Sequence, residues 1–337
     1  MNAIGKEGLG MEEKISAEWN HVLEQTSALR AEIAKVIVGQ EKVVEQMLVA
    51  LLCRGHCLIV GVPGLAKTLL VSTLGKILGL KFHRIQFTPD LMPMDIIGSE
   101  ILQDAGGGQQ RRFEFSAGPI FANLILADEI NRTPPKTQAA LLEAMQEKQV
   151  SVSGKQMKLE DPFIVYATQN PIEHEGTYPL PEAQLDRFFF NLLIDYPDIE
   201  HEREIVLKTT GREEQSVDAI MNADDVLRLQ NAVLDVPVPD NVLDNVLKLA
   251  TMSRPGSALS DDYVNEYVGW GAGPRASQNM IRASKALALL RGNAAASMEE
   301  LLEVAKPVLR HRIIPNYNAT GEGVDVEMII EHLLEKV

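Results

Sequence analysis

The chain is predicted to be an α/β protein, with a mostly parallel sheet in its first part and a small all-helical domain in its second. Three observations predict this. Apolar runs that fit buried strands alternate with helical stretches in the first part, which is typical of a parallel sheet with helices on both faces. A Gly/Pro-rich turn joins the first of these runs to a helix. Beyond Tyr196-Pro197-Asp198, amphipathic helical periodicity continues without a convincing run of strands.

The domain boundaries follow from the same change of pattern. A chain of 337 residues is long enough for about two domains. Residues 1–15 are Gly-rich, charged and weakly periodic, so we expect a flexible N-terminus. The first domain is then expected over 16–196 and the helical domain over 197–337.

The first domain's elements can be placed in order. Helices are expected over 17–36 and 40–54, with Gly39 as the break, and from about Lys67 to Leu78. A further helix is expected over Pro135–Glu147. The expected buried strands are Cys57–Val60, Leu124–Ala127, Phe163–Thr168 and Phe188–Ile194.

Two insertions interrupt this pattern. Residues 88–118 contain two prolines and a run of three glycines, and they are expected to hold a hairpin around Ile101 and Phe113. Residues 148–160 alternate polar and apolar around Ser153-Gly154, which is a hairpin signal. In the second domain, amphipathic helices are expected over 198–210, 223–234, 239–252, 260–269, 275–291 and 297–309.

Composition and charge narrow the function classes. The apolar runs fall short of the ~20 residues of a membrane span, and the acidic first 20 residues argue against a secretory signal. Two cysteines argue against a disulfide framework and fit a reducing compartment, so a cytoplasmic location is expected. The net charge of −15 disfavours a general nucleic-acid binder. The most acidic stretch, 198–225, is either a solvated surface or a docking face for a basic partner.

A phosphate-binding loop is predicted after the first strand. The residues Gly61-Val62-Pro63-Gly64-Leu65-Ala66-Lys67-Thr68 match the spacing GxxxxGK[ST], except that Ala66 replaces the second glycine. Small residues let the backbone N–H groups turn toward phosphate, and the helix N-terminus adds its partial positive charge. Lys67 is expected to reach the β/γ-phosphates and the Thr68 hydroxyl to bind Mg²⁺. Ala66 is expected to fit if it keeps a negative φ.

Two carboxylates follow the strand at 124–127. Asp128 is expected to hold Mg²⁺ through water, and Glu129 to polarise the attacking water, since ligands bind at the carboxyl ends of parallel strands. The alternative is that Asp128 is a helix N-cap and Glu129 a first-turn residue. The phosphate-binding loop upstream favours the metal and water roles over this alternative.

Three further polar residues are candidates. Asn170 ends another expected strand and is able to position water, although an Asn-Pro pair is by itself a common turn. Arg187 precedes the last expected strand, where a surface ion pair is the simpler interpretation. Arg275 lies near a helix N-terminus, which is unfavourable for a cation and so hints at an anionic partner.

These motifs, taken in order, resemble the AAA+ ATPases and specifically the MoxR family. The residues that carry the resemblance are GVPGLAKT at 61–68, LILADEINR at 124–132, ATQNPIEHEGTYPLPEAQLDRF at 168–188 and GPRA at 273–276. The likeness runs from about residue 30 to near the end of the chain. Ala66 is the usual form of the loop in this family.

The resemblance implies a P-loop AAA+ αβα core with a helical lid and ATP as cofactor. It also implies a ring, usually a hexamer, with nucleotide between subunits. Asn170 would be sensor 1, Arg275 sensor 2 and Arg187 an arginine finger offered in trans, so that Lys67, Arg187 and Arg275 would converge on phosphate. The two insertions would be the helix-2 insert and the pre-sensor hairpin. The implied nucleotide-binding residues are Val38, Gly39, Gly61, Pro63, Gly64, Leu65, Ala66, Lys67, Thr68, Leu69 and Asp128.

The resemblance further implies a chaperone that matures other proteins or assists metal insertion, with partners that carry a von Willebrand factor A domain. The alternative is a nucleic-acid motor, which needs basic pore hairpins. The 148–160 hairpin has three Lys against one Glu, but the 88–118 insert holds more acidic than basic residues. The chaperone is therefore the favoured function.

Several clusters are interpreted as structural. Cys53, His56 and Cys57 lack the second ligand pair that zinc needs and lead into an apolar strand. Glu173-His174-Glu175 is expected to be a loop without metal. The basic pairs and triplets, Arg111-Arg112 and Arg310-His311-Arg312, are expected on an exposed face or in ion pairs, with partner or nucleotide contact as the alternative.

Overall fold

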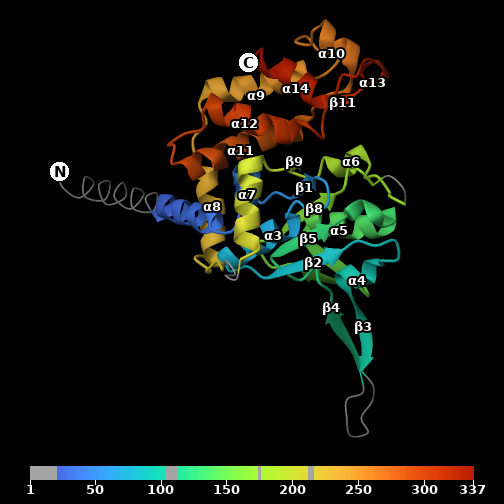
Figure 1. Cartoon of the computed structure of the whole chain (residues 1–337). Coiled ribbons are helices and arrows are strands. Elements are labelled where there is room, and N and C mark those ends of the chain that lie inside the picture. Colours follow the sequence, from blue (N-terminus) through green and yellow to red (C-terminus); the bar gives the residue numbers. More distant parts are fainter. Residues whose placement is uncertain (1–20, 104–111, 174–175, 212–215) are drawn as a thin grey trace, which may run out of the picture.

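The computed structural model describes residues 21–103, 112–173, 176–211 and 216–337 (Figure 1). The expected flexible segment 1–15, the glycine run 106–108, and Arg111, His174 and Glu175 lie outside the described residues. A five-stranded sheet with the order β2-β5-β8-β1-β9 forms the centre of the first part. All of its neighbouring strands pair in parallel, which confirms the predicted sheet. Its strands are β1 (Cys57–Val60), β2 (Phe82–Gln86), β5 (Leu124–Asp128), β8 (Ile164–Gln169) and β9 (Phe190–Leu193).

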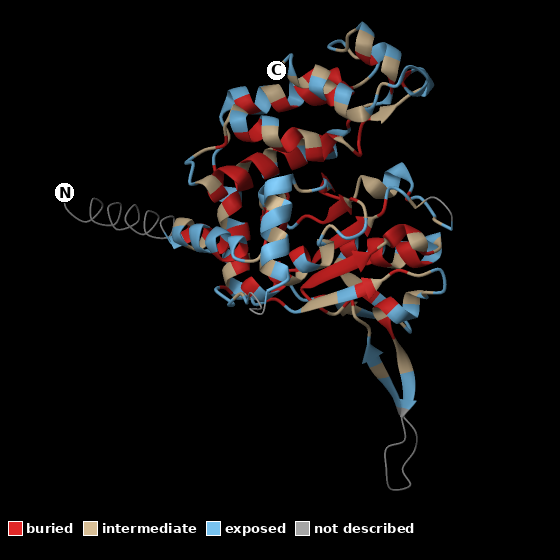
Figure 2. Cartoon of the chain, viewed as in Figure 1, coloured by how far each residue is buried: buried red, intermediate tan, exposed pale blue. Residues whose placement is uncertain are grey.

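Helices cover both faces of this sheet, which is why its central strands are apolar throughout. Along β5, Leu124 and Leu126 belong to one buried cluster, and Ile125 and Ala127 belong to another. This alternation is the period of two that a pleated strand imposes. The first cluster includes residues of α2 (Glu41–Leu52) and α3 (Lys67–Ile77), and the second includes residues of α5 (Pro135–Glu147). Figure 2 shows the central strands as buried.

The edge strand β2 was not predicted, and its composition explains the miss. Its sequence is FHRIQ, in which only Ile85 is buried. Because β2 pairs with β5 alone, much of the strand is accessible and carries charged and polar side chains. An apolar run therefore never forms, although the strand supplies Arg84 and Gln86 to the site described below.

Both predicted insertions contain hairpins. In the first, α4 (Pro93–Ile97) leads into β3 (Gly98–Gln103), which pairs antiparallel with β4 (Arg112–Ala117). This hairpin projects away from the sheet in Figure 1. In the second, β6 (Gln149–Val152) pairs with β7 (Lys155–Lys158). The turn residues Ser153 and Gly154 have φ values of 50° and 78°, as a two-residue hairpin turn with both φ positive requires.

Among the described residues, the remaining regular elements are helices and one small strand pair. The first described helical residues are 21–34, and the short elements α6 (Glu182–Leu185) and η1 (Ile130–Arg132) lie within the first part. Strands β10 (Val268–Trp270) and β11 (Ile314–Pro315) correct the expectation that the second part lacks strands, and they are too short to show a period. The remaining helices are α7 (Ile199–Thr209), α8 (Ala223–Asp235), α9 (Asp240–Met252), α10 (Asp262–Tyr267), α11 (Pro274–Arg291), α12 (Met298–Leu309), α13 (Tyr317–Glu322) and α14 (Val326–Leu334).

The helical part packs directly onto the sheet part through α11. This helix contacts α2 and α8, and it also contacts α9 and α12. One hydrophobic cluster runs through all five helices. Arg291, at the end of α11, adds ion pairs to Glu45 of α2 (3.1 Å) and Glu303 of α12 (2.6 Å).

Candidate functional site

The predicted phosphate loop lies between the carboxyl end of β1 and the first turn of α3. The Lys67 ammonium donates to the carbonyl oxygens of Gly61 (2.5 Å) and Val62 (3.2 Å), so the loop holds it in place. Partial burial lowers the pKa of Lys67, and the nearby carboxylates of Asp128 and Glu129 oppose that shift. A cation held in this way at a helix N-terminus is suited to an anionic ligand.

The backbone of this loop differs from one expectation. Ala66 has a φ of 52°, in the left-handed region, so the prediction of a negative φ at this residue is wrong. The loop therefore keeps the backbone shape that favours glycine and accepts a Cβ there, at a cost of about 1–2 kcal/mol for an L-residue. Gly64 has a φ of 87°. Both residues turn the loop around the start of α3.

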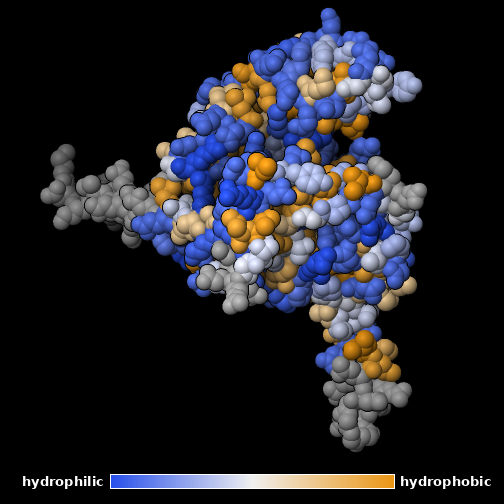
Figure 3. Space-filling view, in the orientation of Figure 1, coloured by the Kyte–Doolittle hydropathy of each residue, from blue (hydrophilic) through white to orange (hydrophobic). Residues whose placement is uncertain are grey.

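An apolar cavity of about 360 Å³ lies beside this loop. α7 supplies its outer wall, with Ile205 and Thr209 among the lining residues. Figure 3 shows apolar surface over α7, where Ile199, Val206 and Leu207 are exposed. Gly39 lies against α7, because a Cβ on it would come within 2.8 Å of the His201 Cβ. The predicted nucleotide-binding residues that line the cavity are Val38, Pro63, Gly64, Leu65, Ala66 and Leu69.

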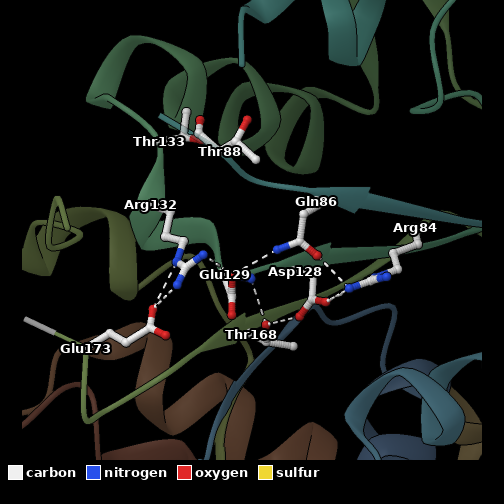
Figure 4. A network of polar contacts seen from close by, with 9 residues as sticks. All are labelled: Arg84, Gln86, Thr88, Asp128, Glu129, Arg132, Thr133, Thr168 and Glu173. Atoms are coloured by element: carbon white, nitrogen blue, oxygen red, sulfur yellow. Dashed lines mark hydrogen bonds and ion pairs between the residues drawn. The ribbon is translucent and has the colours of Figure 1, made fainter. Parts of the chain in front are cut away.

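The Asp128 carboxylate ends β5 in a network of hydrogen bonds (Figure 4). Its Oδ1 accepts a hydrogen bond from the Thr168 hydroxyl at 2.6 Å, and its Oδ2 accepts one from Arg84 Nη2 at 2.6 Å. Asp128 is 8% exposed. Burial and two donors fix the carboxylate at the edge of the sheet where the phosphate loop also lies, since β1 and β5 both run parallel to β8, which lies between them.

Glu129 follows in an unusual backbone conformation, with a φ of 57°. Its backbone N–H donates to Thr168 Oγ1 at 2.8 Å, so this hydroxyl links both carboxylate residues. Its Oε2 accepts from Gln86 Nε2 at 2.8 Å and lies 3.2 Å from Arg132 Nη1 (Figure 4). Because both contacts use Oε2, Oε1 is left to accept a hydrogen bond from a ligand. The left-handed backbone at this residue is a strained feature of the kind found at functional sites.

Asn170 ends β8 and is 5% exposed. Its Oδ1 accepts from the backbone N–H of Ile172 at 3.2 Å, whereas its Nδ2 is buried and has no hydrogen-bond partner among the residues that the structure describes. A buried amide nitrogen without an acceptor costs about 1–3 kcal/mol, so its persistence points to a ligand that supplies the acceptor. The arrangement is suited to positioning a water or a phosphate oxygen.

Arg187 and Arg275 lie elsewhere, so the expected convergence with Lys67 does not occur within one chain. Arg187 precedes β9, whereas the phosphate loop follows β1. Because β1 and β9 are parallel neighbours, Arg187 and the phosphate loop lie at opposite edges of the sheet. Arg187 and Arg275 line a second cavity of about 520 Å³. Arg275 Nη1 also donates to Asp186 Oδ2 at 2.7 Å.

This second cavity is strongly cationic. In addition to Arg187 and Arg275 it is lined by Arg54, Lys148 and Arg282, and no acidic residue lines it. Within the described part of the chain, neither Arg187 nor Arg282 forms an ion pair. Lys148 and Arg275 are paired with Asp161 and Asp186, which do not line the cavity, so five cations face two paired acids. This excess of positive charge favours an anionic ligand. We call it the cationic cavity.

Some residues of the site were not predicted from the sequence to take part in it. Arg84 and Gln86 lie on the unpredicted strand β2, and Thr168 lies within a predicted strand but without a role. Glu173 was interpreted as a loop residue without metal, and it forms an ion pair with Arg132 at 2.6 Å. The only available signal was that polar residues interrupt or end otherwise apolar strands at the same edge.

Two of the predicted site residues carry the kind of ligand atom that a metal needs. Asp128 and Thr68 offer hard oxygen ligands of the type that Mg²⁺ takes. Among the residues that the structure describes, no group of three or more His, Cys, Asp and Glu side chains is placed to hold a metal. Cys53 and Cys57 are free and buried. None of the described helices is both long enough and apolar enough to cross a bilayer.

The fold and the site are those of an AAA ATPase, and comparison with known proteins supports this. Residues 56–190 match the model of the ATPase family associated with various cellular activities (AAA), and residues 261–333 match the AAA lid domain. The chain belongs to the MoxR family of these ATPases. It is 45% identical to chaperone MoxR1 of Mycobacterium tuberculosis over 91% of this chain and 80% of that protein.

Two further relatives cover almost the whole chain. The protein YeaC of Bacillus subtilis is 39% identical over 90% of this chain and 92% of its own length. A crystal structure of a Cytophaga hutchinsonii protein is similar with a TM-score of 0.90 and 41% identity, covering 97% of this chain and 98% of that one. The AAA+ core with a helical lid predicted from the sequence is thereby confirmed.

Proposed function

We propose that the protein is a Mg-ATP-dependent ATPase that acts as a chaperone and remodels or matures partner proteins, as a head-to-tail hexameric ring of subunits. The observation that carries the proposal is the division of the site. Lys67, Asp128 and Glu129 lie at one edge of the sheet, and Arg187 and Arg275 lie at the other. A second subunit is needed to bring the two sets together.

In the first half of the site, the chain's own residues hold the nucleotide. The base would occupy the apolar cavity that Val38 lines, with Gly39 as the next residue in the chain, and the phosphates would lie on the loop 61–68. Thr68 and Asp128 would hold Mg²⁺, which would neutralise phosphate charge when bound. The loop lysine contacts the β/γ-phosphates.

Hydrolysis uses the residues around Glu129. Its free Oε1 accepts a hydrogen bond from the attacking water and orients it, and the Asn170 amide donates to the water or the γ-phosphate. Gln86 and Arg132 hold the other carboxylate oxygen and keep the side chain in place. This explains why both groups lie at the strand ends that carry the phosphate loop.

The neighbouring subunit supplies the second half. Its cationic cavity brings Arg187 as arginine finger and Arg275 as the lid sensor to the phosphates, where positive charge stabilises the transition state. A finger of this kind is worth roughly 10³–10⁵ in turnover. An isolated subunit is therefore expected to be a poor ATPase.

The structure offers one argument against the alternative of a nucleic-acid motor. Of the three lysines of the β6–β7 hairpin region, Lys148 pairs with Asp161 at 2.8 Å and Lys155 lies 3.6 Å from Glu100. These lysines are less available for phosphate contacts than their number suggests. Client proteins, including partners with a von Willebrand factor A domain, fit the proposed function better; the acidic stretch around α7 is the surface to test for them.

Mixed rings test the shared site. Arg187→Ala and Glu129→Gln subunits, each nearly inactive alone, are expected to regain ATPase activity when mixed, because some interfaces then combine an intact finger with an intact Glu129. The Glu129→Gln protein must still bind ATP, which equilibrium binding checks. Activity that stays at the level of the separate variants, at all mixing ratios, contradicts a site shared between subunits.

A further inference from the structure

The turn that follows α12 holds the segment that carries Arg187. Three successive residues of this turn, 310–312, donate to backbone carbonyls on both sides of Arg187. Arg310 Nη1 donates to Asn191 O at 2.5 Å, and its guanidinium is also paired with Glu327 of α14. His311 Nε2 lies 3.0 Å from Phe188 O. Because a carbonyl only accepts, this ring nitrogen carries the proton.

Arg312 makes the most complete set of contacts. Its Nε donates to Asp186 Oδ1 at 2.8 Å, and its Nη2 donates to the carbonyl oxygens of Phe188 (2.6 Å) and Asp186 (3.2 Å). Its Nη1 donates to Phe189 O (3.3 Å) and to Val308 O in the last turn of α12 (2.5 Å). A guanidinium has five N–H donors, and all five are used here. Burial lowers the pKa of Arg312 to about 10, with Asp186 opposing the shift, so the group stays charged at pH 7.

The sequence interpretation of this cluster is corrected in part. Arg310-His311-Arg312 was expected on an exposed face or in ion pairs. Arg312 is 5% exposed and His311 is 7% exposed, so the exposed face is wrong for both, whereas the ion pair of Arg312 with Asp186 is present. Burial and the neighbouring Arg312 lower the pKa of His311, which keeps the ring neutral.

Stability alone gives little reason to bury a guanidinium here. Taking a charged group out of water costs several kcal/mol, and well-packed apolar residues often replace a buried ion pair without loss of stability. What an apolar side chain does not provide is a set of directed donors, three to the backbone of Asp186, Phe188 and Phe189 and one to the Asp186 carboxylate. The residue enclosed by these contacts is Arg187, whose own side chain stays free to face the cationic cavity.

Asp186 extends the connection to a second element of the lid. Its Oδ1 accepts from Arg312, and its Oδ2 accepts from Arg275 at the start of α11. The residue directly before Arg187 is thus held by two separate lid elements. A movement of either lid element has to move the backbone beside Arg187.

We propose that Arg312 is a positioning residue that fixes Arg187 for its action on the neighbouring subunit's nucleotide and couples the lid to the finger. The inference rests on the proposed function of Arg187. A displacement of a catalytic group by 1 Å can lower the rate about 10²-fold. Loss of the Arg312 contacts permits a displacement of Arg187 of that size.

The test compares Arg312→Met and Arg312→Lys with Arg187→Ala in the full-length chain. Arg312→Met is expected to lower kcat about 10²-fold and to leave the ATP Kd of the subunit's own phosphate loop within about threefold. Lysine has three donors on one nitrogen and does not reproduce the planar fork of the guanidinium. Arg312→Lys is therefore expected to lower kcat almost as much as Arg312→Met. The double variant Arg312→Met/Arg187→Ala is expected to be no slower than Arg187→Ala alone, because both changes remove the same finger.

A matched control separates positioning from general stability. Arg291→Met also breaks ion pairs between the lid and α2, but it lies at the far end of α11 from Arg275. It is expected to lower Tm with kcat nearly unchanged. If Arg312→Met lowers Tm but not kcat, or if its effect multiplies with that of Arg187→Ala, the positioning role is wrong. If Arg187→Ala itself retains full kcat, the proposed function fails instead.

Discussion

The ion pair between Arg84 and Asp128 gives a prediction about Mg²⁺ binding. Asp128 is the carboxylate proposed to hold the metal, and Arg84 Nη2 lies 2.6 Å from its Oδ2. Arg84 therefore competes with a cation for the same oxygen. Replacing it in Arg84→Met removes the charge and keeps a side chain of similar length. We expect the variant to bind Mg²⁺ more tightly.

The size of the effect follows from the exposure of the pair. Two unit charges 4 Å apart interact by about 4 kcal/mol at an effective dielectric constant of about 20, whereas exposed ion pairs are worth about 0–1 kcal/mol. The Arg84 side chain is 48% exposed and that of Asp128 is 11% exposed, so the pair lies between these limits. We take about 1–2 kcal/mol, which is a factor of about 5–30 in an equilibrium constant.

The assay is a calorimetric titration of Mg²⁺ into ATP-loaded protein that carries Glu129→Gln to prevent turnover. Arg84→Met in this background is expected to lower the Mg²⁺ Kd by about 5–30-fold. Arg228→Met is the control for net charge, because Arg228 is exposed and pairs with Asp225 on α8, away from the phosphate loop. An Mg²⁺ Kd that is unchanged or higher in Arg84→Met refutes the competition between Arg84 and the metal.

Two further predictions concern the loop and the cationic cavity. Ala66→Gly is expected to keep the ATP Kd within about twofold. Ala66→Val places a β-branched residue at a positive φ and is expected to weaken ATP binding at least tenfold in a fluorescent-nucleotide titration. Equal ATP affinities of the two variants would show that the positive φ at residue 66 is not needed for binding. Arg282→Gln removes one of the five like charges of the cationic cavity. This variant is expected to preserve Tm but to lower kcat at least tenfold. An unchanged kcat would mean that Arg282 does not face the nucleotide of the neighbouring subunit.

The features predicted from the sequence are those that depend on local order along the chain. Strand β1, the loop 61–68 and helix α3 are consecutive, so spacing alone identifies them. The end of β5 was predicted for the same reason, because an apolar run stops at two carboxylates. Helix α5 was placed with its observed bounds, since proline marks its start.

The features that were missed depend on contacts between distant segments. Thr168 is 40 residues from Asp128, and Arg84 is 44 residues away, yet both bond to its carboxylate. Strand pairing in the sheet brings them there, and no local pattern records it. Arg312 is the clearest case, because four of its five hydrogen bonds go to acceptors 123–126 residues earlier in the chain and its sequence neighbours suggest an exposed cluster.

The division of the site also bears on how subunits are able to associate. A two-fold symmetric dimer through the cationic face would place two copies of the cationic cavity against each other, with five cations from each and no acid lining either. Like charges at such short distances repel. Head-to-tail contact instead places this face against the phosphate loop of the next subunit, where bound ATP supplies the opposite charge. Such heterologous contacts form rings when the rotation closes. We therefore expect nucleotide to promote assembly, and assembly that is equally strong without ATP, by analytical ultracentrifugation at matched salt, would contradict this role of the cavity.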